Sequence, residues 1–133
     1  MKKIGRIIFI GLAALLLLCF TVQFILAGMA AFVNYEYWKD HMLFVHLFGF
    51  NLPIIMLLTA LISKFPRKVS LQLAAIFGLV FLMYVTANVS SLFPWVGALH
   101  PLFGILLFLV SIAILKTSFR LTFKNTDKIS SGH

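Results

Sequence analysis

Four apolar stretches, separated by short polar connectors, run along most of the chain. They cover about residues 7–33, 41–62, 69–89 and 96–115. A bilayer core of about 30 Å needs roughly 20 apolar residues in a helix that rises 1.5 Å per residue, and each stretch is that long. The connectors cover residues 34–40, 63–68 and 90–95. Because such short connectors make consecutive helices antiparallel neighbours, the pattern predicts an all-α fold, a four-transmembrane-helix up-down bundle.

The polarity of the chain divides it into two segments. We expect the four-helix transmembrane domain to occupy residues 1–120. Residues 121–133 form a basic cytoplasmic tail that ends in Ser130, Ser131, Gly132 and a histidine. This tail has little apolar surface to bury, and we therefore expect it to be disordered.

The Lys and Arg residues predict how the bundle is oriented in the membrane. Ten of the eleven fall at the amino end, in the second connector or after the fourth stretch: Lys2, Lys3, Arg6, Lys64, Arg67, Lys68, Lys116, Arg120, Lys124 and Lys128. The other, Lys39, lies in the first connector beside Glu36 and Asp40. Because cytoplasmic loops carry an excess of Lys and Arg, we expect a multi-pass protein of the cell membrane with both termini cytoplasmic.

Composition supports the membrane class and limits the partners. Apolar residues make up 62% of the chain and charged residues 11%, against about 45–50% and about 25% in soluble domains. The formal net charge is +8, but the basic residues fall at segment ends rather than on one face. We therefore expect membrane lipids, and not nucleic acid, as partners. A cleaved signal peptide is the alternative for the first stretch, which is much longer than a signal core of roughly 7–15 residues.

Polar side chains recur at one depth near the outer ends of the spans. Counting from the cytoplasmic end of each span places a set of them at about 26–29 Å: Gln23, His46, Thr86, Asn88 and His100. His41 comes about a turn and a half higher, at the membrane surface. Polar groups inside a bilayer are costly, so the layer needs an explanation. Two remain open: hydrogen bonds that pack the helices, each worth about 1 kcal/mol or less, or a ligand site.

The histidines are the candidate metal ligands. His41 and His46 are five residues apart, so their side chains point about 140° apart around a helix and do not easily share one ion. No Asp or Glu lies in the apolar stretches to complete a zinc site with three protein ligands. His46 and His100 lie on different spans, and haem needs only two axial protein ligands. We therefore expect haem b between the second and fourth spans, with His46 and His100 as iron ligands.

Several further residues belong to this predicted haem site. We expect Gln23 and Asn88 to lie beside the axial ligands, and His41 is a further candidate for cofactor binding. Gly49 and Gly104 share a helix face with His46 and His100 and would leave room for a flat macrocycle. Pro53 removes a helix hydrogen bond and should kink the second span near Gly49.

The chain resembles a bacterial family of four-helix membrane proteins of unknown function, in an ordered set of short motifs: Gln23-x-x-x-Ala27-Gly28, Trp38-Lys39-Asp40-His41-x-x-x-x-His46-Leu47-Phe48, Tyr84-x-x-Ala87-Asn88 and Leu99-His100-Pro101. The resemblance spans roughly residues 5–118 and brings no established activity. It implies that the polar residues of these motifs matter: Gln23, His41, His46, Asn88 and His100. More distantly, the chain is similar to haem A synthase halves and small b-type cytochromes. It lacks the acidic residue beside the histidine that haem A synthases show.

These observations favour a membrane protein that binds b-type haem for electron transfer or haem handling near the outer face. The alternative is a non-catalytic accessory or assembly protein whose polar layer only packs the helices. A third interpretation is a small quinone or lipid pocket in the same layer. A quinone or a redox protein is thus an expected partner. No nucleophile–base pair, phosphate loop or paired carboxylate supports a hydrolase or a nucleotide-dependent enzyme, and the sequence leaves open the natural ligand, any enzymatic activity and the oligomeric state.

Overall fold

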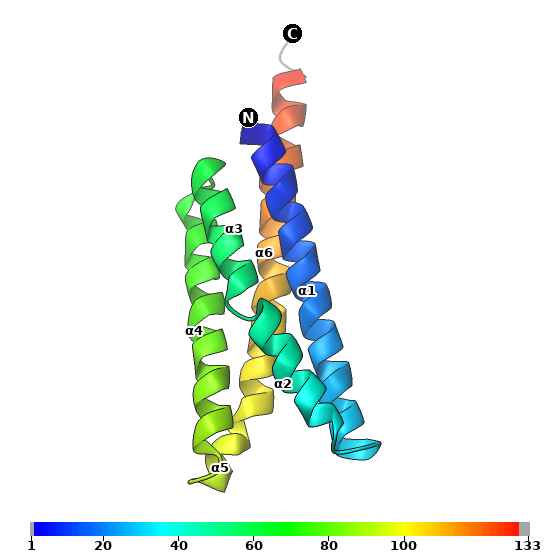
Figure 1. Ribbon diagram of the computed structural model, residues 1–133. Coiled ribbons are helices and arrows are strands. Elements are labelled where there is room, and N and C mark those ends of the chain that lie inside the picture. Colours follow the sequence, from blue (N-terminus) through cyan, green and yellow to red (C-terminus); the bar gives the residue numbers. More distant parts are fainter. Residues whose placement is uncertain (1, 131–133) are drawn as a thin grey trace.

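A computed structural model describes the backbone of residues 2–130 and the side chains of residues 2–123. Within this part the chain forms helices and no strand: α1 (Lys2–Phe32), α2 (Tyr37–Phe48), α3 (Asn51–Ile62), α4 (Arg67–Val89), α5 (Pro94–Gly97) and α6 (Leu99–Ser130). Consecutive spans run antiparallel, with α2 and α3 together forming one span, and the start of α1 lies at the same end of the molecule as the end of α6 (Figure 1). The predicted all-α up-down bundle is confirmed.

Four helical segments of the described part are long and apolar enough to cross a membrane. They are Lys2–Phe32, Tyr37–Ile62, Arg67–Val89 and Pro94–Phe123. Large apolar side chains stand exposed along their length, such as Ile25, Leu58 and Leu109, each more than half exposed. Such a continuous apolar exterior suits hydrocarbon and not water. The chain is therefore a multi-pass membrane protein.

The first and last helices extend beyond the predicted spans. Helix α1 begins at Lys2, and α6 continues to Ser130, past the predicted end of the fourth stretch near Leu115. Residues 121–130 of the predicted tail are thus described as helical backbone. Residues 131–133 and the side chains of residues 124–130 lie outside the described part, and a separate tail over residues 121–133 stays a prediction.

Buried residues recur along the helices at alternating spacings of four and three. They are Phe9, Ala13, Leu16, Phe20 and Gln23 on α1, and Val69, Leu73, Ile76 and Val80 on α4. This average spacing of 3.5 residues keeps one seam of each helix turned toward its neighbours, as in a left-handed helix bundle. The apolar members of both seams belong to one core, which also includes Met56 and Ile114.

The second span is broken between α2 and α3, at Gly49 and Phe50. Pro53 has no N–H for the helix ladder, and the side-chain amide of Asn51 donates to the carbonyl of Leu47 at 2.9 Å. A Cβ atom on Gly49 would lie 2.6 Å from the Val45 carbonyl oxygen, so the bend requires glycine. The predicted kink is confirmed.

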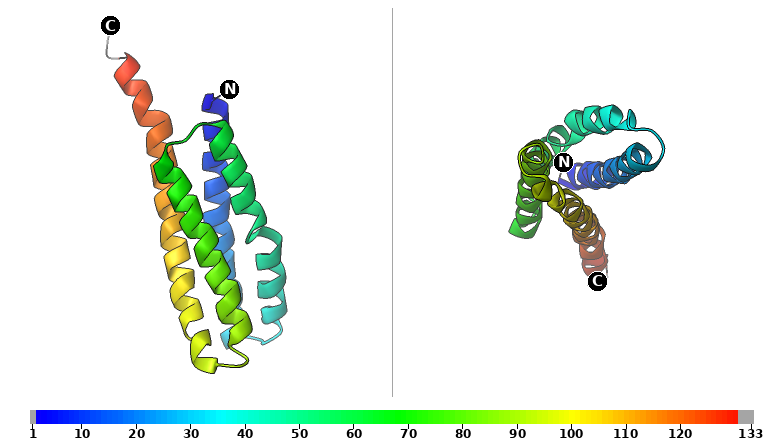
Figure 2. Two further views of the ribbon diagram at one scale, coloured as in Figure 1. Left: turned by 90° about the vertical axis from the view of Figure 1, so that its left-hand side faces the viewer. Right: turned by 90° about the horizontal axis from the view of Figure 1, so that it is seen from below.

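Beyond this break, α2 leans away from α4 and α6. Among the described residues it packs on α1 and α3, and none of its Cα atoms comes within 8 Å of one in α4 or α6. Figure 2, left, shows the displacement of α2 from α4. Side chains alone therefore connect α2 to α4 and α6, at the end of the bundle away from the chain termini.

Candidate functional site

Polar side chains from four helices meet at this end, which the basic residues predict to be the outer one. The outer polar cluster consists of Gln23 on α1, His41 on α2, Thr86 on α4 and His100 on α6. Gln23 is 8% exposed and Thr86 3% exposed, and both histidines are half-buried. Each of the four spans contributes one residue. The cluster therefore links α2 to α4 and α6, which the backbone of α2 does not approach.

Gln23 and His41 hold α1 and α2 together by a reciprocal pair of hydrogen bonds. The Gln23 Nε2 amide donates to the backbone carbonyl of His41 at 3.0 Å. In return, Nδ1 of His41 lies 3.3 Å from the backbone carbonyl oxygen of Gln23. A carbonyl oxygen only accepts, so Nδ1 of His41 carries the ring proton in this arrangement. Its Nε2 atom is left with a lone pair.

His100, on α6, is held by hydrogen-bond acceptors of α4. Its Nδ1 atom lies 3.1 Å from the backbone carbonyl oxygen of Met83 and 3.1 Å from Oγ1 of Thr86. The Thr86 hydroxyl donates to the carbonyl of Leu82 at 2.8 Å, which leaves its oxygen free to accept. Both neighbours of Nδ1 are therefore acceptors, and Nε2 of His100 also keeps a lone pair.

The two histidine rings lie beside one another. Their centroids are 6.5 Å apart, and their planes meet at 60°. The ring of Trp38 packs edge-on against His41 at 5.4 Å. The Oε1 atom of Gln23 is buried and has no hydrogen-bond partner within the described part of the chain. The cluster thus combines two imidazole lone pairs with an unpaired amide oxygen, a set that suits a cation or a hydrogen-bond donor.

Two residues of the predicted layer lie outside this cluster. His46 is exposed, and its Nδ1 atom lies 2.5 Å from the carbonyl oxygen of Met42, on its own helix. Its ring packs against Tyr84 at 5.5 Å. Asn88 is exposed as well and donates to the backbone carbonyl of Tyr84 at 2.8 Å. The structure therefore brings His41, and not His46, to His100.

The reason lies in the direction of the side chains around the helix. Depth fixes the height of a residue and not the direction in which it points. Since His41 and His46 point about 140° apart, only one of them can face the cluster, and it is His41. Thr86 belongs to the predicted layer but not to the predicted haem site. Its predicted depth was the feature of the sequence that indicated it. Its contact with His100 depends on how α4 and α6 pack.

Protein atoms fill the spaces beside both glycines of the predicted haem site. A Cβ atom on Gly104 would lie 3.5 Å from Met83 and from the ring of Phe24. At Gly49 the nearest atoms belong to Val45 and Tyr84. In this structure protein side chains occupy the space beside each glycine, and a haem between His46 and His100 stays a prediction.

The described residues contain no group of three or more His, Cys, Asp or Glu side chains that could hold a metal ion. The potential ligands of the outer polar cluster are two imidazoles and the Gln23 amide oxygen. Cys19, half-buried lower on α1, packs against the apolar core instead.

The chain matches the sequence model of a family described as Family of unknown function (DUF6220), over residues 23–89. This segment includes three of the four cluster residues, Gln23, His41 and Thr86, whereas His100 follows it. No curated protein and no solved structure matches the chain, and the distant similarity to haem proteins stays a prediction. The motifs had led us to expect a family of unknown function. Because the match covers half of the 133 residues, the chain belongs to this DUF6220 family.

Proposed function

We propose that this small integral membrane protein binds a transition-metal cation at the outer polar cluster. Nε2 of His41 and Nε2 of His100 would be the ligands, and Oε1 of Gln23 a third donor. One observation carries the proposal: both rings direct Nδ1 to a backbone carbonyl oxygen, and their centroids lie 6.5 Å apart. The protein would then be a metal-binding membrane module, and not a structural subunit alone.

Metal-bound histidines almost always donate their other ring N–H to a carbonyl or a carboxylate, which fixes the tautomer and the ring orientation. His41 and His100 both have this arrangement. Metal–nitrogen bonds of about 2.0–2.1 Å place the centroids of two imidazoles that share an ion about 5–6 Å apart. Small side-chain rotations close the remaining difference from the observed 6.5 Å.

The chemistry of the cluster favours copper. Imidazole suits zinc, copper, iron and nickel, and of these copper is the one that proteins also bind as a monovalent ion. All four cluster residues are neutral ligands or hydrogen-bonding groups, so the full charge of the ion would remain in the membrane. Because a charge is costly there, the cluster favours the monovalent ion, Cu(I).

Other ligands have less support from the same contacts. A quinone needs hydrogen-bond donors for its carbonyl oxygens, whereas both ring N–H groups and the Thr86 hydroxyl already donate to backbone carbonyls. A haem held by His46 and His100 would need the faces of Gly49 and Gly104, where protein atoms lie. Haem therefore becomes an outcome of the test.

The test is metal binding by the purified full-length protein. Titration with Cu(I) against a competing chelator should show one copper per chain. His41→Ala and His100→Ala should each lose most of the affinity, while His46→Ala, a matched histidine on the exposed side of α2, should retain it. An equal loss in all three variants, or no bound copper, would contradict the proposal. A Soret band in the wild-type protein from haem-replete cells would favour haem instead.

A further inference from the structure

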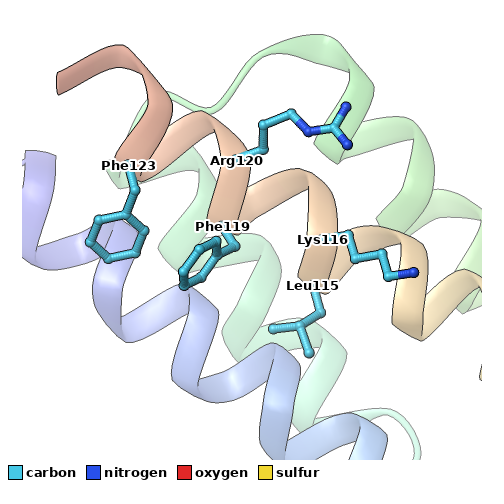
Figure 3. A pocket seen from close by; sticks show the side chains of 5 residues that line it. All are labelled: Leu115, Lys116, Phe119, Arg120 and Phe123. Atoms are coloured by element: carbon cyan, nitrogen blue, oxygen red, sulfur yellow. The ribbon is translucent and has the colours of Figure 1, made fainter. Parts of the chain in front are cut away.

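A hollow of about 470 Å³ lies on α6 at the opposite end of the bundle, near the chain termini. It is lined by Leu115, Lys116, Phe119, Arg120 and Phe123. The rings of Phe119 and Phe123 pack against each other with their centroids 4.7 Å apart. Figure 3 shows these rings on one flank of α6 and the side chains of Lys116 and Arg120 on the other. The hollow thus has an aromatic wall and a basic wall.

The two cations of this hollow have no carboxylate partner among the described side chains. Glu36 and Asp40, the acidic residues in that part, lie at the other end of the bundle. Lys116 and Arg120 are exposed and four residues apart on one helix, so their side chains are neighbours on its surface. They form a basic pair that can bind an anion from outside the chain.

The contacts of Arg6 show where the hollow lies relative to the apolar exterior. Its Nη1 atom donates to the backbone carbonyl of Leu121 at 3.3 Å, which places the start of α1 level with the hollow. Ile4 is 65% exposed and Ile7 48% exposed on that part of α1. Phe119 is 56% exposed. The lipid-facing apolar surface therefore reaches the basic pair, which is the arrangement expected at the boundary between acyl chains and headgroups.

We infer that this hollow binds an anionic phospholipid. The phosphate would lie between Lys116 and Arg120, where the guanidinium can form two parallel hydrogen bonds with it. The upper part of an acyl chain would pack on Leu115 and Phe119. A free phosphate ion would use the basic wall but not the aromatic one, and a zwitterionic lipid would bring a cation to two unpaired cations. The two walls together fit a lipid with a net negative headgroup.

Native mass spectrometry of the full-length protein in detergent tests this inference. Phosphatidylglycerol should be retained in preference to phosphatidylcholine with the same acyl chains. The double variant Lys116→Gln/Arg120→Gln should bind phosphatidylglycerol about thirtyfold more weakly, from two lost headgroup contacts. The matched variant Arg67→Gln/Lys68→Gln loses the same charge from the start of α4, outside the hollow, and should stay within about threefold of the wild type.

Three results would overturn the inference. An equal loss in both double variants would mean diffuse attraction to the basic end of the protein. Equal retention of the two lipids would mean that the headgroup is not recognised. Displacement of the lipid by millimolar inorganic phosphate, with no effect of Phe119→Ala, would mean that the basic pair binds phosphate alone. Unchanged thermal unfolding of each variant shows that the fold is retained.

Discussion

Replacing Gln23 by Leu separates a ligand role of this amide from a packing role. The substitution removes the hydrogen bond to the His41 carbonyl, and bonds of this kind between membrane helices stabilise by about 0.6 kcal/mol on average. It also removes the buried Oε1 atom that has no described partner, and such an unsatisfied group costs about 1–3 kcal/mol. The balance is a gain of about 0.4–2.4 kcal/mol in the unfolding free energy of the metal-free protein.

The same substitution should weaken copper binding, because it removes the third donor and the hydrogen bond to the His41 backbone carbonyl that positions α2 against α1. Losses from groups that orient a metal ligand are about 10–100-fold. Gln23→Leu is thus expected to stabilise the metal-free protein and to weaken its metal site. A protein in which Gln23 only packs the helices would show the first effect without the second.

Gln72 provides a matched control for this experiment. Its Nε2 amide donates to Thr117 at 3.2 Å across α4 and α6, and its Oε1 atom is also buried without a described partner. Gln72→Leu should therefore stabilise the protein to a similar degree and leave copper binding unchanged.

Thermal unfolding with a thiol-reactive dye measures both stabilities, because Cys19 is the only cysteine of the chain and is half-buried. A destabilisation of more than about 1 kcal/mol by Gln23→Leu, with no such effect of Gln72→Leu, would refute the reasoning. It would mean that Oε1 of Gln23 has a partner in the folded metal-free protein.

Two further predictions concern the end that carries the termini. Arg6→Ala should cost about 2–3 kcal/mol in the same unfolding assay, since Arg6 donates to the carbonyls of Leu121 and Lys64 and packs on the ring of Phe65. Arg6→Lys should recover only part of this stability, because one ammonium group does not reach both carbonyls. Full recovery would contradict a role of Arg6 in joining the two carbonyls. A reporter fused after His133 should be cytoplasmic, as the basic residues predict, and an external signal would contradict this orientation.

The bundle could be predicted from the sequence because its signals are local. Lengths of apolar runs and the short connectors fix the number and order of the helices. The break in the second span followed from Pro53, which lacks a backbone N–H. The ends of α1 and α6 were harder to predict, because an apolar run marks the hydrocarbon core, and helical backbone continues past it.

The polar cluster could be predicted only in part. Counting residues along straight helices placed Gln23, Thr86 and His100 at one height. In the structure Thr86 contacts His100, and Gln23 is linked to them through His41. The same count placed His41 above the layer, but α2 is tilted and separated from α3 by the break, so distance along the chain no longer measures depth. The choice between His41 and His46 depends on the rotation of α2 against α1, which is set by packing over the whole interface.

X-ray absorption spectroscopy of the copper-loaded protein tests the metal site most directly. The proposed site predicts two imidazole nitrogens at about 2 Å from the metal, with one imidazole lost in His41→Ala and both retained in His46→Ala. A sulfur ligand at about 2.3 Å, or a spectrum that changes with His46→Ala and not with His41→Ala, would contradict it.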